Sequence, residues 1–543
     1  MFDLKNWQDI TEELKTKAIE FPQFNVNKVK EEGKKAPIWL HFGGGNLYRG
    51  FHAELAQNLA NQNLLDVGIV VCETFDEEVV TKAYKPFHND VLEVIMHEDG
   101  QLDKKILAAT AESIYCQPEN DNGFKQVVSY FENPTLQFVT LSITEKGYGL
   151  KNTDGHFSSM AQADIDNGPA KVKHTIGIIT ALLYKRFLAG ELPIAMVSTD
   201  NFSQNGKRFL NSVNELAQAW QEKNFVAPAF LDYLNTPEKV SFPWSMIDRI
   251  TPNPSETVQQ TLEKSGWSDM SIIHTSKHTN IAPFTNTEVV HYLVIEDSFP
   301  NGRPALEKAG VILTDRKTVD KVDIMKVTTC LNPLHTALAV TGCLLGYQSI
   351  SAEMNDQDLV GLIKGIGYQE GLPVVENPGI IQPQAFIDEV IQQRLTNPNI
   401  PDTPQRIASD TSQKVAIRFG ETIKKYQEDP NRNVQELTFI PLAIAAWLRY
   451  LLAIDDEGQP FVPSPDPLLT ELQTVLQDIT FGEQETEKIH TSLVPILQNN
   501  TIFGIDLVQI GLSEKIETFF KEMVVSPGAV RQTIHRYVEM GGK

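Results

Sequence analysis

The sequence predicts an α/β domain built on a parallel sheet, followed by a mostly α-helical domain. Apolar, β-branched segments alternate with segments of helical periodicity over residues 38–145, and a glycine-rich turn follows the first of them. Strand candidates become rare beyond about residue 313. A chain of 543 residues exceeds the size at which a single hydrophobic core stops growing, so we expect two domains, residues 1–312 and 313–543.

The elements of the first domain can be followed along the chain. The strand candidates are "IWLHFGGG", "DVGIVVCETF", "LQFVTLSIT" and "PIAMVSTDN", and "GFHAELAQNLANQN" has helical periodicity. Strand, helix and strand at this spacing predict a parallel sheet with crossover helices.

The second domain is read from a series of helical patterns, among them "PLHTALAVTGCLLGY", "AFIDEVIQQRL" and "KVAIRFGETIKKYQE". The longest apolar stretch, "FIPLAIAAWLRYLLAI", is interrupted by Arg449 and is too short to span a bilayer. It therefore predicts a buried helix.

Composition excludes some classes of partner. The formal net charge of -23 argues against nucleic acid or an anionic membrane, so an anionic ligand would need a local cationic pocket. The first residues lack the apolar core of a signal peptide, and the four cysteines form no CxxC pair. We therefore expect a cytoplasmic protein with reduced thiols.

The turn "HFGGGNLYRGF" follows a predicted strand and opens a predicted helix. Gly43 and Gly45 stand in G-x-G relation, which allows a tight turn and a close approach of backbone to a pyrophosphate. With Asn46 beside them and Arg49 as a charged contact to phosphate, the turn predicts a dinucleotide site, although an ordinary glycine turn would look alike. Glu73 ends the second strand, where an acid bonds ribose hydroxyls and favours NAD over NADP.

The stretch "KVTTCLNPLH" places three polar side chains among apolar segments. Asn332 as an N-cap and Pro333 as the first helical residue explain the asparagine without any chemistry. They do not explain Lys326, because a buried lysine is costly unless it is paired or neutral. His335 is either a satisfied core residue or part of a site.

Two further segments point to a ligand. Asn201 follows a predicted strand at its carboxyl end, where open α/β sheets bind ligands. Arg406 and Lys414 are eight residues apart on an expected helix, so both cations should point to one side. A solvated helix face is the alternative for this pair.

Taken together, these segments resemble the polyol-specific long-chain dehydrogenases, the family of mannitol 2-dehydrogenase, fructuronate reductase and tagaturonate reductase. The resemblance covers residues 38 to 455 and is carried by "HFGGGNLYRGF", "LSITEKGY", "VSTDNFSQNG", "FPWSMIDRITP", "VIEDSFPNGRPALEKAGV", "LNPLHTALAVTGCLLGY", "RIASDTSQK" and "LAIAAWLRYLLA". It implies a Rossmann-type domain, a helical substrate domain and metal-independent hydride transfer with NAD(P).

The resemblance also implies roles for single residues. Lys326 looks like the general acid/base, and Asn201 and Asn332 look like the pair that hydrogen-bonds the substrate oxygen. His335, Arg406 and Lys414 look like substrate-positioning groups, and Asp248 is expected near the cofactor. "HTSKH" lacks a third ligand, so no metal is expected.

The sequence departs from the family at one point. The family's lysine lies five residues before the asparagine, whereas Lys326 lies six before Asn332. On a continuous helix, at about 100° per residue, Lys326 and His335 would face opposite sides. The extra residue requires a bulge or a break before Pro333.

Within the family, "CLNPLHTALAV" is most similar to the hexuronate reductases, which implies NAD-dependent reduction of D-fructuronate to D-mannonate. A neutral ketose, giving mannitol or arabinitol, is the alternative, because polyol enzymes carry similar cations. A nucleotide-binding regulator that has lost its chemistry is a third possibility. The expected partner is a small sugar acid or polyol, with the chain a monomer or weak homo-oligomer.

Overall fold

The computed structural model describes residues 2–152 and 154–541, which form two compact units. One unit holds residues up to 97 together with 101–320; the other holds 98–100 and the residues from 321 onward. The α/β and helical fold classes predicted for the two parts are confirmed. None of the helices in the described ranges combines the length and apolar character that crossing a bilayer requires.

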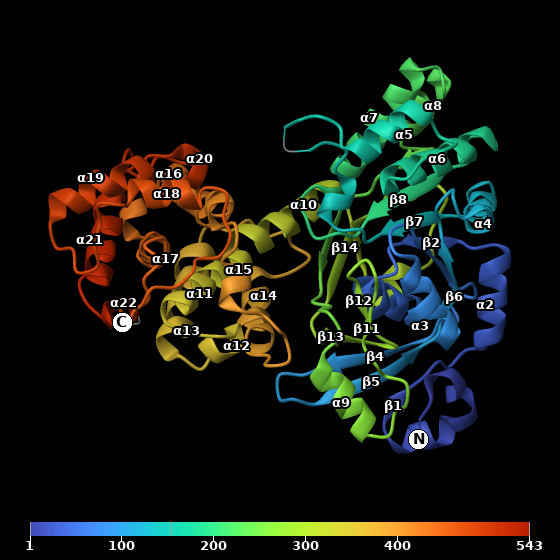
Figure 1. Cartoon of the computed structure of the whole chain (residues 1–543), viewed down its shortest axis with the longest axis horizontal. Helices are drawn as coiled ribbons and strands as arrows, with labels where there is room; N and C mark the ends of the chain where they lie inside the picture. Colours follow the sequence, from blue (N-terminus) through green and yellow to red (C-terminus); the bar gives the residue numbers. More distant parts are fainter. Residues whose placement is uncertain (1, 153, 542–543) are drawn as a thin grey trace. The chain divides into compact units, whose positions relative to one another are not determined.

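The first unit is built on a six-stranded parallel sheet of order β6-β3-β2-β7-β8-β9 (Figure 1). The strands are β2 (Trp39–Phe42), β3 (Ile69–Glu73), β6 (Thr110–Tyr115), β7 (Phe138–Leu141), β8 (Ile194–Ser198) and β9 (Val240–Ser241). The chain runs outward from β2 to one edge and then returns to β7 and runs to the other edge. This is the strand order of a dinucleotide-binding sheet, in which the ligand crevice opens where the direction reverses.

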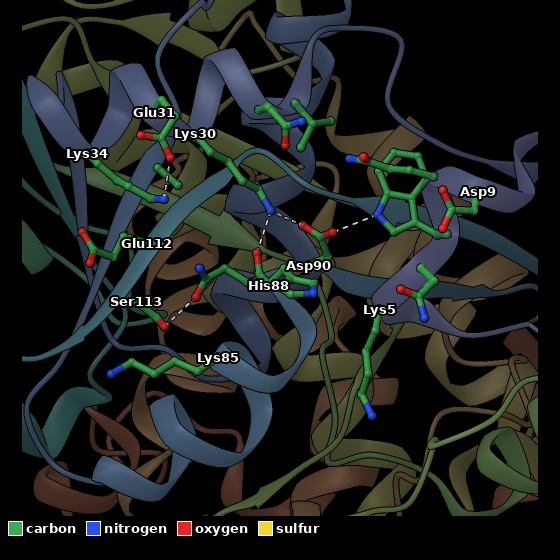
Figure 2. A pocket seen from close by; sticks show the side chains of 17 residues that line it. Lys5, Asp9, Lys30, Glu31, Lys34, Lys85, His88, Asp90, Glu112 and Ser113 are labelled. Atoms are coloured by element: carbon green, nitrogen blue, oxygen red, sulfur yellow. Dashed lines mark hydrogen bonds and ion pairs between the residues drawn. The ribbon is translucent and has the colours of Figure 1, made fainter.

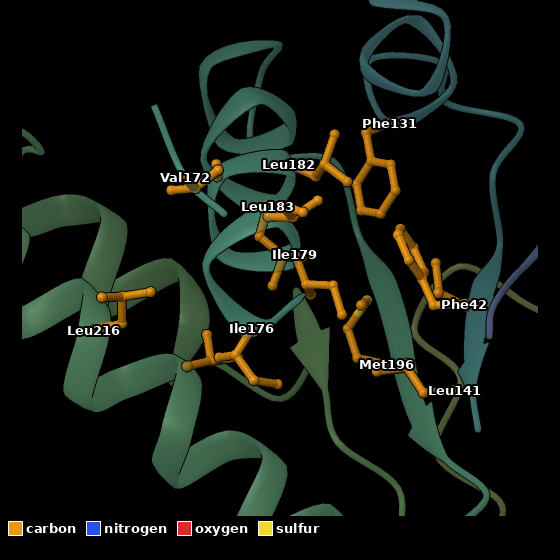
Figure 3. Close-up of a cluster of buried hydrophobic side chains, with 14 of the residues drawn as sticks. Phe42, Phe131, Leu141, Val172, Ile176, Ile179, Leu182, Leu183, Met196 and Leu216 are labelled. Atoms are coloured by element: carbon orange, nitrogen blue, oxygen red, sulfur yellow. The ribbon is translucent and has the colours of Figure 1, made fainter. Parts of the chain in front are cut away.

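Both faces of this sheet are buried. One face packs on α4 (Asp121–Phe131), α6 (Thr175–Leu188) and α7 (Asn205–Glu222), and Figure 3 shows side chains of α6, β7 and β8 meeting there. Alternate residues of the same strands face α3 (Ala53–Asn61) on the other side. Burial on both faces explains why the predicted strands are continuous apolar runs.

Smaller sheets complete the first unit. A four-stranded sheet of order β1-β5-β4-β13 comprises β1 (Ile19–Glu20), β4 (Val91–Met96), β5 (Leu102–Leu107) and β13 (Phe284–Glu288). A three-stranded sheet comprises β10 (Ser245–Asp248), β14 (Tyr292–Glu296) and β15 (Ile312–Thr314), and a hairpin comprises β11 (Ile273–His274) and β12 (Asn280–Ile281). The remaining helices are α1 (Thr11–Thr16), α2 (Val26–Lys35), α5 (Ser159–Asn167), α8 (Pro228–Leu234) and α9 (Glu256–Lys264).

The second unit is helical, drawn from yellow-green to red in Figure 1. Its principal helices are α11 (Asn332–Leu344), α13 (Gln357–Lys364), α14 (Pro383–Glu389), α16 (Glu421–Glu428), α17 (Phe439–Tyr450), α19 (Thr486–Leu497), α21 (Ser513–Val524) and α22 (Ala529–Gly541). Every residue of α17 is buried, and the helix packs on α11 and α21, as expected for an apolar helix inside a protein. Arg449 is accommodated because its guanidinium donates to the carbonyls of Met523, Ile454 and Asp455.

Candidate active site

The glycine turn lies at the carboxyl end of β2, between the ends of β3 and β7. The Gly43 amide donates to the Cys72 carbonyl at 2.9 Å, and Gly43 has a φ of +106°. A Cβ on Gly43 would lie 2.2 Å from the Ser142 carbonyl oxygen, so no other residue fits. The Tyr84 hydroxyl donates to the Gly44 carbonyl at 2.8 Å and fixes the middle of the turn.

Glu73 ends β3 as predicted, but its carboxylate is already occupied by backbone groups. It accepts the amides of Gly44 at 2.9 Å, Thr74 at 3.0 Å and Phe75 at 2.8 Å, together with a longer bond from Asp76. Burial raises the pKa of Glu73, and the amides oppose that rise. Glu73 thus holds the glycine turn against β3, and its contact with a ribose stays a prediction.

Beside the turn lies the buried cation Arg49. It lies on the π-helical segment η2 (Tyr48–His52), is 1% exposed, and stacks over the Tyr84 ring at 5.4 Å. In the described part of the chain no acceptor reaches any of its three guanidinium nitrogens, and the Asn46 side-chain oxygen is likewise unpaired. Burial lowers the pKa of Arg49 to about 10. An unpaired cation beside a glycine turn fits the pyrophosphate of a dinucleotide.

Asn201 is exposed just beyond the carboxyl end of β8, as predicted. The neighbouring Asp200 carboxylate accepts the amides of Ile143 at 2.9 Å and Thr144 at 2.8 Å, and the Tyr148 hydroxyl at 2.8 Å. These bonds tie the loop after β7 to the loop after β8. They hold the sheet edge that Asn201 occupies.

Asp248 ends β10 and is 5% exposed, and its neighbour Arg249 was missed by the sequence reasoning. The Arg249 guanidinium is 2.6 Å from the Glu54 carboxylate on α3. Burial favours a higher pKa for Glu54, but Arg249 and Lys105 outweigh it and lower the pKa to about 2. The conspicuous "SMIDRITP" therefore anchors the helix that follows the glycine turn. The position of Asp248 near a cofactor remains a prediction.

In the second unit, Lys326 opens the π-helical segment η7 (Lys326–Cys330), which continues α10 (Arg316–Met325). Leu331 then leaves helical geometry, with φ -129° and ψ -62°, before α11 begins. The expected bulge before Pro333 is therefore confirmed. Lys326 is 2% exposed, and its ammonium lies 3.7 Å from the Asp323 carboxylate, so the buried charge has a counter-ion.

The expected N-cap role of Asn332 is wrong. Asn332 is the first residue of α11, and the cap position is occupied by Leu331, whose side chain makes no capping hydrogen bond. Because Asn332 lies within the helix and not at its cap position, its side chain does not cap this helix end. Among the described residues its side chain has no hydrogen-bond partner, which leaves it available to a ligand.

The expectation of one continuous helix carrying Arg406 and Lys414 is also wrong. Helix α15 ends at Ile407, Asp410 is left-handed with φ +54°, and η10 (Thr411–Gln413) is a short 3-10 turn. The two cations nevertheless belong to one charged cluster, since the charge of Arg406 contributes to lowering the pKa of Lys414, of which burial is the main cause.

His335, one turn into α11, faces the same cluster. Its Nε2 lies 3.5 Å from the carboxylate of Asp402, which also pairs with Arg406. Burial lowers the pKa of His335 to about 4, with Asp402 opposing and Arg418 and Arg406 adding to the shift. The imidazole is therefore neutral at physiological pH. Asp402 gave no signal in the sequence because only the fold brings it to His335.

A separate hollow of about 560 Å³ lies elsewhere in the first unit (Figure 2). At its centre Lys30 pairs with the Asp90 carboxylate and donates to the His88 carbonyl at 2.6 Å, while the Trp7 indole donates to Asp90 at 2.8 Å. Because these buried groups satisfy one another, the network joins the N-terminal segment to the body of the unit without requiring a ligand.

Each of the two units matches a domain of one known protein family. The mannitol dehydrogenase Rossmann domain matches residues 37–308, and the mannitol dehydrogenase C-terminal domain matches residues 318–524. The D-mannonate oxidoreductase of Thermotoga maritima is 50% identical over 519 residues, which are 95% of each chain. The D-mannonate oxidoreductase of Escherichia coli is 27% identical over 445 residues, covering 80% of this chain and 84% of that one.

Two solved structures share the fold. A D-sorbitol dehydrogenase in substrate-free form superposes with a TM-score of 0.79 at 24% identity, covering 95% of this chain and 97% of that one. The mannitol 2-dehydrogenase of Pseudomonas fluorescens, in a ternary complex with NAD and D-mannitol, gives a TM-score of 0.70 at 23% identity, covering 99% and 100%. At this identity the likeness concerns the fold alone.

Proposed function

Because the chain belongs to the mannitol dehydrogenase family and is an oxidoreductase, we propose that it reduces D-fructuronate to D-mannonate with NADH. The observation that carries this proposal is the 50% identity, across 95% of both chains, with a D-mannonate oxidoreductase. The cations around His335 are compatible with it, because they can pair with the carboxylate that a sugar acid brings to an otherwise acidic protein.

The cofactor proposal is supported by the first unit. The glycine turn offers backbone amides, and Arg49 offers a buried, unpaired cation, to a dinucleotide diphosphate. Glu73 at the end of β3 favours NAD over NADP, because a carboxylate there would repel a 2′-phosphate. Asp248 is proposed to lie near the same cofactor.

When bound, the nicotinamide supplies the hydride that reduces the ketone carbon. Residues of the chain stabilise the charge on the ketone oxygen and supply its proton. Lys326, whose side-chain nitrogen lies 3.7 Å from the Asp323 carboxylate, gives a proton to the oxygen as the alcohol forms. The free amide of Asn332 donates a hydrogen bond to that oxygen and stabilises its developing charge, and the resemblance gives Asn201 the same role.

Following NADH by absorbance with D-fructuronate and D-fructose in parallel tests the proposal. A strong preference for fructuronate in kcat/KM is expected. Preference for fructose would instead make the chain a polyol dehydrogenase. Tight NADH binding without turnover of either substrate would favour a regulator that has lost its chemistry.

A further inference from the structure

Arg418 is a cation of the second unit that no sequence pattern singled out. It lies on the π-helical segment η11 (Ala416–Gly420) and is only partly exposed. Its Nη1 donates to the Thr336 hydroxyl at 2.5 Å. Within the described ranges no carboxylate reaches ion-pair distance of this guanidinium, and burial alone lowers the pKa of Arg418 to about 10. Such a charge is costly unless a ligand pairs with it.

Arg418 is linked by hydrogen bonds to Asn332, which is proposed to bind the substrate oxygen. The Thr336 hydroxyl that accepts from Arg418 donates in turn to the Asn332 carbonyl at 2.9 Å. Arg418 is thus one bridging hydroxyl away from the residue proposed to hold the substrate oxygen. Its charge also reaches His335, adding to the effect of burial on the imidazole pKa.

Two other cations of the cluster, Arg406 and Lys414, are already engaged. Arg406 is 62% exposed and pairs with Asp402, and the Lys414 ammonium donates to the Ser409 carbonyl at 2.5 Å. By contrast, Arg418 pairs with no carboxylate among the described residues, and only its Nη1 is engaged, with the Thr336 hydroxyl. The guanidinium keeps several N–H groups in a planar fork, the geometry that binds a carboxylate through two parallel hydrogen bonds.

We infer that Arg418 binds the carboxylate of the sugar-acid substrate and thereby selects it over a neutral ketose. The inference rests on the proposed function and adds the residue that recognises the acid. The carboxylate and the ketone stand toward opposite ends of D-fructuronate, so binding the acid at Arg418 orients the ketone end for the proton donor. A neutral ketose leaves the guanidinium unpaired and loses that contribution.

The test compares Arg418→Gln with wild type on D-fructuronate and D-fructose, with NADH in excess. The variant should lose roughly 100-fold in kcat/KM for fructuronate, mostly through KM, because one partner of a charged pair is removed. Activity with fructose should change by less than about threefold, since no carboxylate is involved. Arg418→Lys, which keeps the charge but not the fork, should fall between the two.

Arg536→Gln serves as the matched control, because Arg536 is an exposed arginine of the same unit whose guanidinium lies 3.2 Å from the Glu522 carboxylate. It should leave both substrates unaffected. Equal losses of fructuronate and fructose activity in Arg418→Gln, with a lowered Tm, would mean that Arg418 merely supports the fold, and would overturn the inference. In the lysine variant, unchanged fructuronate KM would overturn it as well.

A wrong proposed function would give a different result from a wrong role for Arg418. In that case wild type itself prefers fructose or turns over neither substrate. If wild type strongly prefers fructuronate and Arg418→Gln keeps that preference, the function stands and only the role of Arg418 is wrong.

Discussion

Replacing Gly43 by alanine tests how the glycine turn is built. The new Cβ would meet the Ser142 carbonyl oxygen at 2.2 Å, while contacts below 3.0 Å are essentially never tolerated. Neither backbone can move freely, because the Gly43 amide bonds the Cys72 carbonyl and the Ser142 amide bonds the Phe42 carbonyl, each at 2.9 Å. Relief therefore requires the ends of β2 and β7 to separate.

The expected cost follows from these two features. A φ of +106° imposes about 1–2 kcal/mol on any residue with a Cβ. Parting the strand ends weakens about one backbone hydrogen bond, a further ~1 kcal/mol. We expect a total of about 2–3 kcal/mol and a Tm lowered by roughly 5 °C. NADH affinity should fall at least tenfold, since the same turn faces the diphosphate.

Thermal melting without cofactor and NADH titration by fluorescence measure the two effects separately. Gly45→Ala is the matched control, because nothing lies within 4 Å of its added Cβ and its Tm should equal that of wild type. If Gly45 approaches the diphosphate, this control weakens NADH binding without destabilising the protein. A Gly43→Ala variant with wild-type Tm and NADH affinity would refute the reasoning.

Three further predictions concern the second unit. Lys326→Ala should lower turnover about 1000-fold while NADH affinity changes by less than about twofold; full activity would refute the proton-donor role. Burial raises the pKa of Glu353 from 4.5 to about 9, so the folded protein keeps a proton that the unfolded chain releases, and stability falls as pH rises between these values. Glu353→Gln should therefore raise the free energy of unfolding at pH 8 by on the order of 3–5 kcal/mol, and Tm with it, but should change neither at pH 4. If the variant and wild type had equal Tm values at pH 8 as well as at pH 4, this prediction would be contradicted. The Glu370 carboxylate accepts the amides of the cap residue Thr438 and of the first two residues of α17, so Glu370→Gln should cost about 2 kcal/mol in urea unfolding, and an unchanged midpoint would argue against this capping role.

The sheet and the helical domain were predictable because their signals are local. Continuous apolar runs at β2, β3, β7 and β8 identify strands buried on both faces, and the glycine turn follows the first of them. The smaller sheets could not be predicted in the same way. For example, β13 pairs with β4 across nearly two hundred residues of sequence, and neither strand carries information about its partner.

The candidate site shows a second, sharper limit, which concerns helix geometry. A helical wheel assumes 3.6 residues per turn, whereas Arg49, Lys326 and Arg418 all lie on π-helical segments with wider turns. Each such segment rotates the following residues relative to the wheel, so a pair counted onto one face need not share it. The same feature resolves the displaced lysine: the six-residue spacing from Lys326 to Asn332, unfavourable on an ideal helix, is absorbed by η7 and by the break at Leu331. A one-residue insertion beside a site is therefore weak evidence for lost chemistry when the backbone can take it up as a π-helical turn. The displaced lysine therefore gives no reason to interpret the chain as a nucleotide-binding regulator that has lost its chemistry. Only the turnover assay can support that interpretation.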